Sequence, residues 1–350
     1  MKDASKRHGA LFEQILEVAS EELEFNFAFI PTTPWAQFLL NPRRLRGSDF
    51  LMRWSQGQWS ERRLIEAVNE TGEFFALPYG ISSVAPENDV KRAELYFEFL
   101  DKANADRAKR PDILIFPSSR RKEVSEILAE VSSIPAPAAI ETLEDKEAAL
   151  SFFKELTATQ RLPFFNETSA LIRKLLQMSI LGVEAENSLW VTEKMPHYRE
   201  PLRPMKRLGG KPGLPKNAVV PTIILKEEDI EPLLAWEQKN EIPIHIWHVF
   251  YDRAFGISLD KALALIQGGL IEPHEQTFQS PGGATTNKNT YRIYYHYAYP
   301  LAETIGSPEL VADYILDKNG HILPYVRFKG GKLRLTDEAI NIIKDIEKRR

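Results

Sequence analysis

The feature that most restricts the fold of this chain is a short apolar run, Ile113–Phe116, which stands between Pro111 and Pro117. Four consecutive apolar residues between two prolines are too few for a helix and indicate a strand that is buried on both faces. Three later segments also have strand character, namely residues 180–186, 218–225 and 243–251. A sheet with a buried centre is therefore expected in the middle of the chain.

Helical periodicity before and between these strands predicts the elements that cover the sheet. The predicted helices are residues 8–24, 60–71, 87–107, 121–132, 144–157, 166–178, 227–239 and 258–267. This order of strands and helices is typical of the α/β class and predicts a mixed sheet flanked by helices. Three regions follow from it: a mainly helical region at 1–108, a core with a helical insertion at 109–270, and a β-rich region at 271–350 packed on the core.

The β-rich region is expected to contain two features. Residues 290–299 have extended character, and residues 322–335 have the pattern of a hairpin that turns at Gly330 and Gly331. Residues 74–77, directly after the helix at 60–71, and residues 25–29 are also compatible with short extended pieces.

Composition excludes several classes of protein. The 350 residues are 43% hydrophobic and 27% charged, which is ordinary for a globular chain. The absence of cysteine excludes thiol nucleophiles, iron–sulfur clusters and cysteine-type zinc sites. No apolar run has the length of a membrane span and no signal peptide precedes the first helix, so a cytoplasmic protein is expected. The 45 basic and 49 acidic residues give a net charge of −4, which excludes a uniformly basic coat but not local basic patches.

Three carboxylates occupy unusual positions in this pattern. Asp112 opens the first buried strand, and Glu184 and Glu186 are two residues apart on the second, so both point to the same face of the sheet. Carboxylates are costly in an apolar core unless they are paired or bind a cation. Oxygen-only ligands of this kind suit magnesium or manganese. An equally simple interpretation is that the strands end at the sheet margin, where the acids are solvated.

The sequence Pro111-Asp112, an apolar strand, and then Glu184-Ala185-Glu186 resembles the metal-binding motif of the PD-(D/E)xK nucleases, in particular type II restriction endonucleases. The order of strands and helices over about 110–255 is similar to the core of that fold. The resemblance implies that Asp112, Glu184 and Glu186 are the catalytic residues, with Asp112 and Glu184 as ligands of Mg²⁺. The motif is short, and its specificity comes from the strand order around it.

The chain departs from the motif at two points. The third motif position, usually lysine, is Glu186, so either Glu186 itself or a lysine such as Lys194 or Lys226 takes the role of activating the water. The two motif halves are also separated by far more residues than a hairpin needs, so the helices between them are expected to be an insertion.

Basic side chains gather downstream of the motif, in a proline-rich segment outside regular structure. They are Lys194, Arg199, Arg203, Lys206, Arg207, Lys211 and Lys216. Such a segment suits contact with DNA phosphates, although a solvated surface loop would have the same composition. A second polar segment contributes Asn287, Lys288 and Arg292, which are residue types that read base edges.

The predicted function is therefore that of a type II restriction endonuclease, the nuclease of a restriction-modification system, which hydrolyses double-stranded DNA at a specific sequence with Mg²⁺. The alternatives are a non-catalytic DNA-binding protein on the same fold and a different metal-dependent hydrolase. A homodimer is expected because two-fold symmetry matches that of a palindromic site. Aromatic residues of the first region could supply its interface or pack within the chain; they are Phe25, Phe27, Phe29, Trp35, Phe38, Phe50, Trp54 and Trp59.

Overall fold

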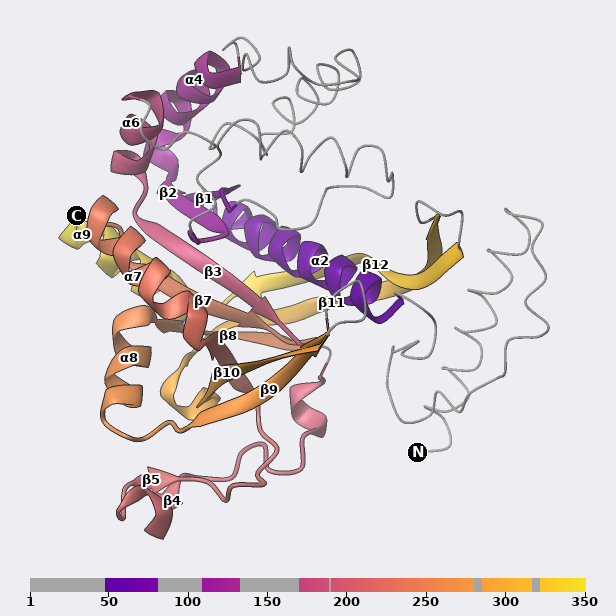
Figure 1. Ribbon diagram of the computed structural model, residues 1–350. Coiled ribbons are helices and arrows are strands. Elements are labelled where there is room, and N and C mark those ends of the chain that lie inside the picture. The colour runs from indigo at the N-terminus through magenta and orange to yellow at the C-terminus, as the bar shows by residue number, and fades with distance from the viewer. Residues whose placement is uncertain (1–47, 81–108, 133–169, 189, 280–284, 317–321) are drawn as a thin grey trace.

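The structure is a computed structural model that describes residues 48–80, 109–132, 170–188, 190–279, 285–316 and 322–350 (Figure 1). Its largest element is a seven-stranded mixed sheet with the order β1-β2-β3-β7-β8-β11-β12. The strands are β1 (Phe74–Pro78), β2 (Ile113–Pro117), β3 (Leu181–Asn187), β7 (Ile244–Val249), β8 (Arg253–Ser258), β11 (Tyr299–Leu316) and β12 (Ile322–Leu335). The predicted α/β class, a mixed sheet flanked by helices, is confirmed.

One pair of strands in this sheet is parallel, and it is the pair that carries the predicted motif. β3 runs parallel to β7, whereas the other neighbours in the sheet are antiparallel. In the β3–β7 register, Glu184 lies opposite Ile246 and Glu186 lies opposite His248. Both glutamates therefore face the same side of the sheet as Ile246.

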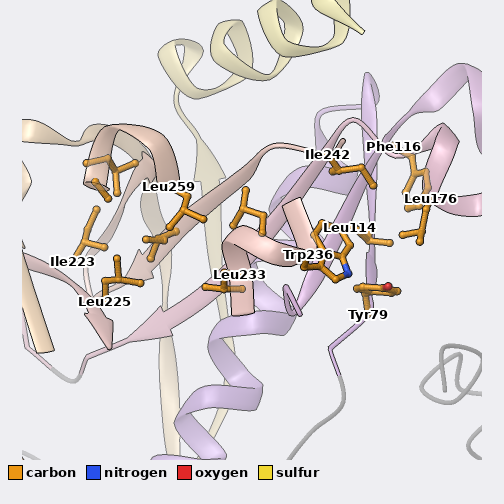
Figure 2. Close-up of a cluster of buried hydrophobic side chains, with 14 of the residues drawn as sticks. Tyr79, Leu114, Phe116, Leu176, Ile223, Leu225, Leu233, Trp236, Ile242 and Leu259 are labelled. Atoms are coloured by element: carbon orange, nitrogen blue, oxygen red, sulfur yellow. The ribbon is translucent and has the colours of Figure 1, made fainter. Parts of the chain in front are cut away.

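Helices cover the two faces of the sheet. They are α2 (Ser48–Glu70), α4 (Arg121–Ser132), α6 (Ala170–Met178), α7 (Glu227–Asn240), α8 (Leu259–Gln267) and α9 (Asp337–Arg349). Leu114 and Ile246 join an apolar cluster with side chains of α4, α6, α7 and α8, part of which Figure 2 shows. Ile113 and Trp247 join a second cluster with side chains of α2 and α9. Alternate residues of β2 thus enter opposite clusters, which is the two-sided burial that its apolar run predicts.

A second, three-stranded sheet lies outside the main one. Its order is β6-β10-β9, from β6 (Thr222–Lys226), β10 (Thr285–Tyr294) and β9 (Pro273–Gln279). Ile223 and Leu225 of β6 enter the same cluster as the α7 side chains, so this sheet packs on the face to which Glu184 and Glu186 point. Because Lys226 is the last residue of β6 and Glu227 the first of α7, the chain turns directly from strand into helix here.

The prediction of a hairpin at 322–335 was wrong. These residues form one strand, β12, which pairs with β11 along its length, so the chain reverses before residue 322. Gly330 and Gly331 have positive φ values of 65° and 80°, as in a tight turn, but Gly330 lies opposite Pro308 inside the ladder, and the irregularity of that ladder falls on β11, between Thr304 and Gly306. Glycine adopts a left-handed backbone inside a strand as readily as in a turn, and the local sequence does not distinguish the two.

Other elements differ from the predictions in their bounds. α2 begins at Ser48 instead of residue 60, β6 begins at Thr222 instead of residue 218, and β10 ends at Tyr294. The predicted helices at 8–24, 87–107 and 144–157 lie outside the described residues. Strands from all three predicted regions share the main sheet, and the boundaries of these regions stay predictions. Within the described part of the chain, no helix is long and apolar enough to cross a membrane.

Candidate active site

Asp112 is fixed at the start of β2 by hydrogen bonds on three sides. Its backbone N–H donates to the Val183 carbonyl at 2.8 Å, and its carbonyl accepts from the N–H groups of Tyr79 and Gly80. Its Oδ2 accepts from the N–H of Ala185 at 2.8 Å, which lies between the two glutamates of β3. A Cβ at Gly80 would lie 2.9 Å from both Cα and Oδ1 of Asp112, so only glycine allows this approach. The Asp112 carboxylate is therefore held against β3 in one orientation.

Glu184 is the most deeply buried acid of the site, with an exposed fraction of 3%. Its Oε1 lies 2.5 Å from Nζ of Lys109, but its Oε2 is buried and has no hydrogen-bond partner among the residues that the structure describes. Burial raises the pKa of Glu184 well above its ordinary value, and the neighbouring Asp112 adds to this effect. A buried carboxylate oxygen without a partner is a position at which a cation would be stabilised.

A second ion pair lies beside the first. Nζ of Lys226 is 2.8 Å from Oε1 of Glu186 and 3.7 Å from Oδ2 of Asp229. Oxygens of Glu184, Glu186 and Asp229 all lie within 4.8 Å of one another. This spacing, with oxygen donors only, suits a divalent cation such as magnesium or manganese.

The charges of the site can be counted from these contacts. Four carboxylates, those of Asp112, Glu184, Glu186 and Asp229, surround the two ammonium groups of Lys109 and Lys226. With every group ionised the net charge is −2, which one divalent cation would neutralise.

The pKa shifts of the two lysines and of His248 agree with the net charge of −2. Burial works to lower the pKa of each lysine, but the carboxylates outweigh it: Asp112 and Glu184 raise the pKa of Lys109, and Glu186 raises that of Lys226. His248 lies opposite Glu186 and is uncharged near neutral pH, because burial and then the Lys226 ammonium lower its pKa to about 3. The histidine therefore adds no charge to the cluster.

The structure brings the three predicted acids together and separates the two candidate lysines. Lys226 enters the cluster, whereas Lys194 is exposed at the end of a short 3-10 helix (Thr192–Lys194). The sequence reasoning missed Lys109 and Asp229. Asp229 lies in the first turn of α7, where the helix dipole alone accounts for an acid, and its spacing of three residues from Lys226 was the one available signal.

Four of the predicted DNA-binding residues are exposed and form no ion pair within the described residues: Lys194, Arg203, Lys206 and Lys216. Arg203 and Lys206 belong to a small hairpin made by β4 (Arg203–Pro204) and β5 (Pro212–Gly213), which projects beyond α8 and β9 in Figure 1. Arg207 and Lys211 instead contact Glu272 and the Gly268 carbonyl, next to the end of α8. These two contacts attach the hairpin to the body of the protein.

The remaining predicted DNA contacts are also partly engaged within the chain. Arg199 pairs with Glu193 at 3.3 Å, and Lys288 pairs with Glu228 of α7 at 2.5 Å. The Asn287 side chain accepts a hydrogen bond from Thr277 on the adjacent strand at 2.9 Å. Arg292 is exposed on β10.

Comparison with known families identifies the chain. A family model described as AccI restriction endonuclease matches residues 42–151 and 214–350. The chain belongs to this family. The matched residues of the AccI family include Asp112, Lys226 and Asp229, whereas Glu184 and Glu186 lie between the two matched stretches. The chain matches no curated protein and no solved structure significantly. Membership of the AccI family makes the protein a restriction endonuclease and implies that it acts on double-stranded DNA.

Proposed function

We propose that this protein is a type II site-specific deoxyribonuclease of the PD-(D/E)xK superfamily that hydrolyses phosphodiester bonds of double-stranded DNA with Mg²⁺. The observation that carries the proposal is the unpartnered Oε2 of Glu184, buried beside Glu186 and Asp229. A carboxylate cluster alone is often only a solvated surface. Here one carboxylate oxygen is buried without a hydrogen-bond partner among the described residues, which is unfavourable for the ionised group unless a cation binds.

Glu184 is the central metal ligand in this proposal. It lies next to Asp112 and within 4.8 Å of the Glu186 and Asp229 carboxylates. Asp112 keeps coordination capacity because its hydrogen bond from Ala185 uses one of several lone pairs. Asp112, Glu184 and Asp229 would hold the ion, and the bound ion would supply polarisation of the scissile phosphate and a lower pKa for the attacking water.

Glu186 and Lys226 together take the role that the motif lysine has in related enzymes. The Lys226 ammonium holds one oxygen of Glu186, which leaves the other oxygen to accept a hydrogen bond from the attacking water. The ammonium would also stabilise the negative charge that develops on a phosphate bound beside the carboxylates. Lys226 supplies the positive charge that the motif lysine has in related enzymes. Glutamate at the third motif position, Glu186, is therefore compatible with catalysis.

The DNA contacts and the homodimer are proposed on physical grounds. The exposed Lys194, Arg203, Lys206 and Lys216 suit phosphate contacts, because they have no competing ion pair within the described residues. A homodimer remains the simplest way for one site per chain to cut both strands. Trp59 does not support its interface, since its indole is buried, stacks on Phe328 and donates to the Gly330 carbonyl of its own chain.

Incubation with phage DNA tests this function. With magnesium the wild-type protein should produce discrete fragments, and with EDTA it should produce none. Glu184→Gln should abolish cleavage with little change in DNA binding, whereas Glu231→Gln, an exposed residue of α7, should leave both unchanged. Binding without cleavage under all conditions would favour the non-catalytic alternative. Neither binding nor cleavage would favour a different hydrolase.

A further inference from the structure

Trp190 differs from the other tryptophans whose side chains the structure describes. Its side chain is 59% exposed, whereas Trp59, Trp236 and Trp247 are each no more than 5% exposed. It follows β3 and stands four residues after Glu186, which is at most about 14 Å along an extended chain. A large exposed aromatic side chain so close to the carboxylate cluster calls for a physical reason.

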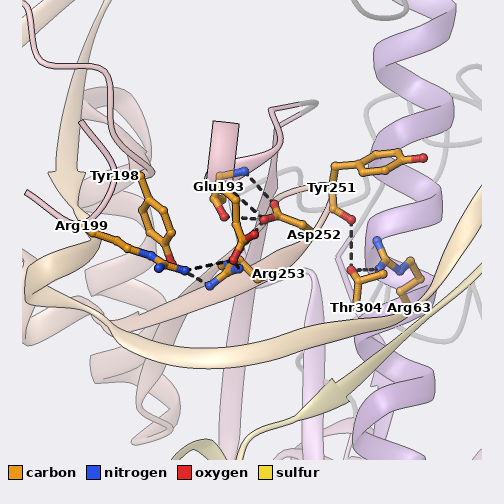
Figure 3. Close-up of polar contacts among 9 residues, drawn as sticks. Arg63, Glu193, Tyr198, Arg199, Tyr251, Asp252, Arg253 and Thr304 are labelled. Atoms are coloured by element: carbon orange, nitrogen blue, oxygen red, sulfur yellow. Dashed lines mark hydrogen bonds and ion pairs between the residues drawn. The ribbon is translucent and has the colours of Figure 1, made fainter. Parts of the chain in front are cut away.

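The backbone of Trp190 is held although its side chain is not covered. Its N–H donates to the Ser188 hydroxyl at 3.4 Å, and its carbonyl accepts from the Tyr251 N–H at 3.1 Å. Tyr251 lies in the turn between β7 and β8, and its own carbonyl accepts from the Thr304 hydroxyl at 3.0 Å. Arg63 of α2, which is 1% exposed, donates to the same hydroxyl at 2.7 Å (Figure 3). Hydrogen bonds thus connect the backbone of Trp190, through Tyr251, to Thr304 of β11 and Arg63 of α2.

The residues after Trp190 are fixed to the same turn. Asp252 accepts from both the N–H and the hydroxyl of Thr192, at 2.7 and 2.6 Å. Arg253 donates to Glu193 at 2.7 Å and to the Tyr198 hydroxyl at 2.6 Å, as Figure 3 shows. These hydrogen bonds prevent the segment from rearranging locally to bury its tryptophan. The indole therefore stays exposed until a partner covers it.

We infer that the indole of Trp190 contacts DNA bases or sugars next to the scissile phosphate. The charge of the neighbouring segment selects DNA over a second copy of the chain. The segment from 190 to 216 carries seven basic residues, Lys194, Arg199, Arg203, Lys206, Arg207, Lys211 and Lys216, against the acids Glu193 and Glu200. Two such basic segments facing each other would repel, whereas the phosphates of DNA would attract both. Base–aromatic contact then gives the indole an apolar partner. The inference rests on the proposed function, because it takes DNA as the substrate of the adjacent carboxylates.

Fluorescence of the full chain tests this inference separately from cleavage. The signal of Trp190 is isolated as the difference between the wild-type protein and Trp190→Phe, and its quenching by acrylamide is measured with and without a 30-base-pair duplex of mixed sequence. EDTA, or calcium in place of magnesium, keeps the duplex intact. The duplex should protect Trp190 from acrylamide, and Trp190→Ala should weaken duplex binding about tenfold or more.

The control is Ile305→Ala, which removes another exposed apolar side chain (45% exposed) on β11 and should leave duplex affinity unchanged. Unchanged melting temperatures of both alanine variants would show that they fold. Duplex binding without protection of Trp190, or an unchanged affinity of Trp190→Ala, would overturn the inference even if the protein cuts DNA. Protection that rises with protein concentration in the absence of DNA would also overturn it, because a second copy would then cover the indole. If DNA protects Trp190 from acrylamide but the protein never cuts DNA, the inference about Trp190 is supported and the proposed cleavage reaction is not.

Discussion

Nζ of Lys226 lies 2.8 Å from Oε1 of Glu186, although 40 positions separate the two residues. Glu186 is in the main sheet, and Lys226 ends a strand of the second sheet, at the junction with α7. The motif strand β3 has no lysine at the usual position, and Lys226 of the second sheet supplies the ammonium group instead.

Removal of the Lys226 charge should impair cleavage more than binding. Lys226→Met should lower the cleavage rate by about 100-fold or more, since general acid–base and charge-stabilising groups contribute on that order. Lys226→Arg keeps a charge and should retain more activity than Lys226→Met. Single-turnover cleavage measures both, and Lys122→Met is the matched control, because Lys122 is exposed on α4 and should affect neither binding nor the chemical step.

Exchange of the pair tests whether the two residues act as a unit. Glu186→Lys alone brings two ammonium groups together and should be inactive, as should Lys226→Glu alone. The double variant, Glu186→Lys with Lys226→Glu, again has one carboxylate and one ammonium group and should cut faster than either single variant. A double-mutant cycle of the cleavage rates measures the interaction between the two residues. Independent, additive losses would contradict a shared role.

Metal binding should require the buried glutamate. Isothermal titration of the wild-type protein with Mn²⁺ or Mg²⁺ should give one strong site per chain, as the net charge of −2 predicts. Glu184→Gln and Asp112→Asn should each weaken it at least tenfold, and Glu231→Gln should not. A Glu184→Gln variant with wild-type metal affinity would show that Glu184 is not a ligand.

The free pair of basic residues on the projecting hairpin should govern the salt dependence of DNA binding. Replacement of Arg203 and Lys206 by glutamine should lower the slope of log affinity against log salt by about two, one for each phosphate contact. Arg207 is left in place because it contacts Glu272 and the Leu214 carbonyl. Glutamine at Lys122 and Lys348, which are exposed on α4 and α9, should leave the slope as it is.

Glu237 on α7 should make stability depend on pH. Burial raises its pKa from 4.5 to about 7, although its hydrogen bond from the Ile244 N–H opposes this change. A carboxyl whose pKa is raised in the folded state favours folding when protonated, so this contribution is full below pH 4.5 and is lost as the pH rises through about 7. Glu237→Gln should therefore be more stable than wild type at pH 8, by about 1 kcal/mol after allowance for partial solvation, and about equal to it at pH 4. Urea denaturation at the two pH values measures this difference, and an equal effect at both would contradict the assignment.

The proposed homodimer predicts twice the mass of one chain in light scattering, in the free protein or with DNA bound. A strict single-chain mass in both states would exclude it. A single chain that pairs only on DNA would keep the mechanism and place the interface elsewhere.

The sequence predicts best where a local pattern has one physical solution. The apolar run before Pro117 could only be a buried strand, and α4 has the predicted bounds because its periodicity and polar flanks agree. Asp112, Glu184 and Glu186 could be singled out because acids at the ends of apolar strands are unusual. The sequence pattern does not show which strands pair with one another in the sheets.

The pairing of the strands explains what was missed. β6 has the composition of a core strand, yet it pairs with β10 in the second sheet, and this pairing brings Lys226 over the β3 glutamates. Asp229 was overlooked because the start of a helix already accounts for an acid. At Gly330 and Gly331 glycine adopts the same left-handed backbone in a turn and inside a strand, so only the pairing with β11 decides between them.

The proposed site is assembled from three separate stretches of chain: Lys109 to Asp112, Glu184 to Glu186, and Lys226 to Asp229. The first and third stretches each supply one lysine and one acid, and the second supplies two acids, so no single stretch contains the whole cluster. During synthesis on the ribosome, the first two stretches emerge before the third, and contacts over such sequence distances form late in folding. A nascent or truncated chain that ends before Lys226 would therefore be unable to damage the genome of the cell that makes it.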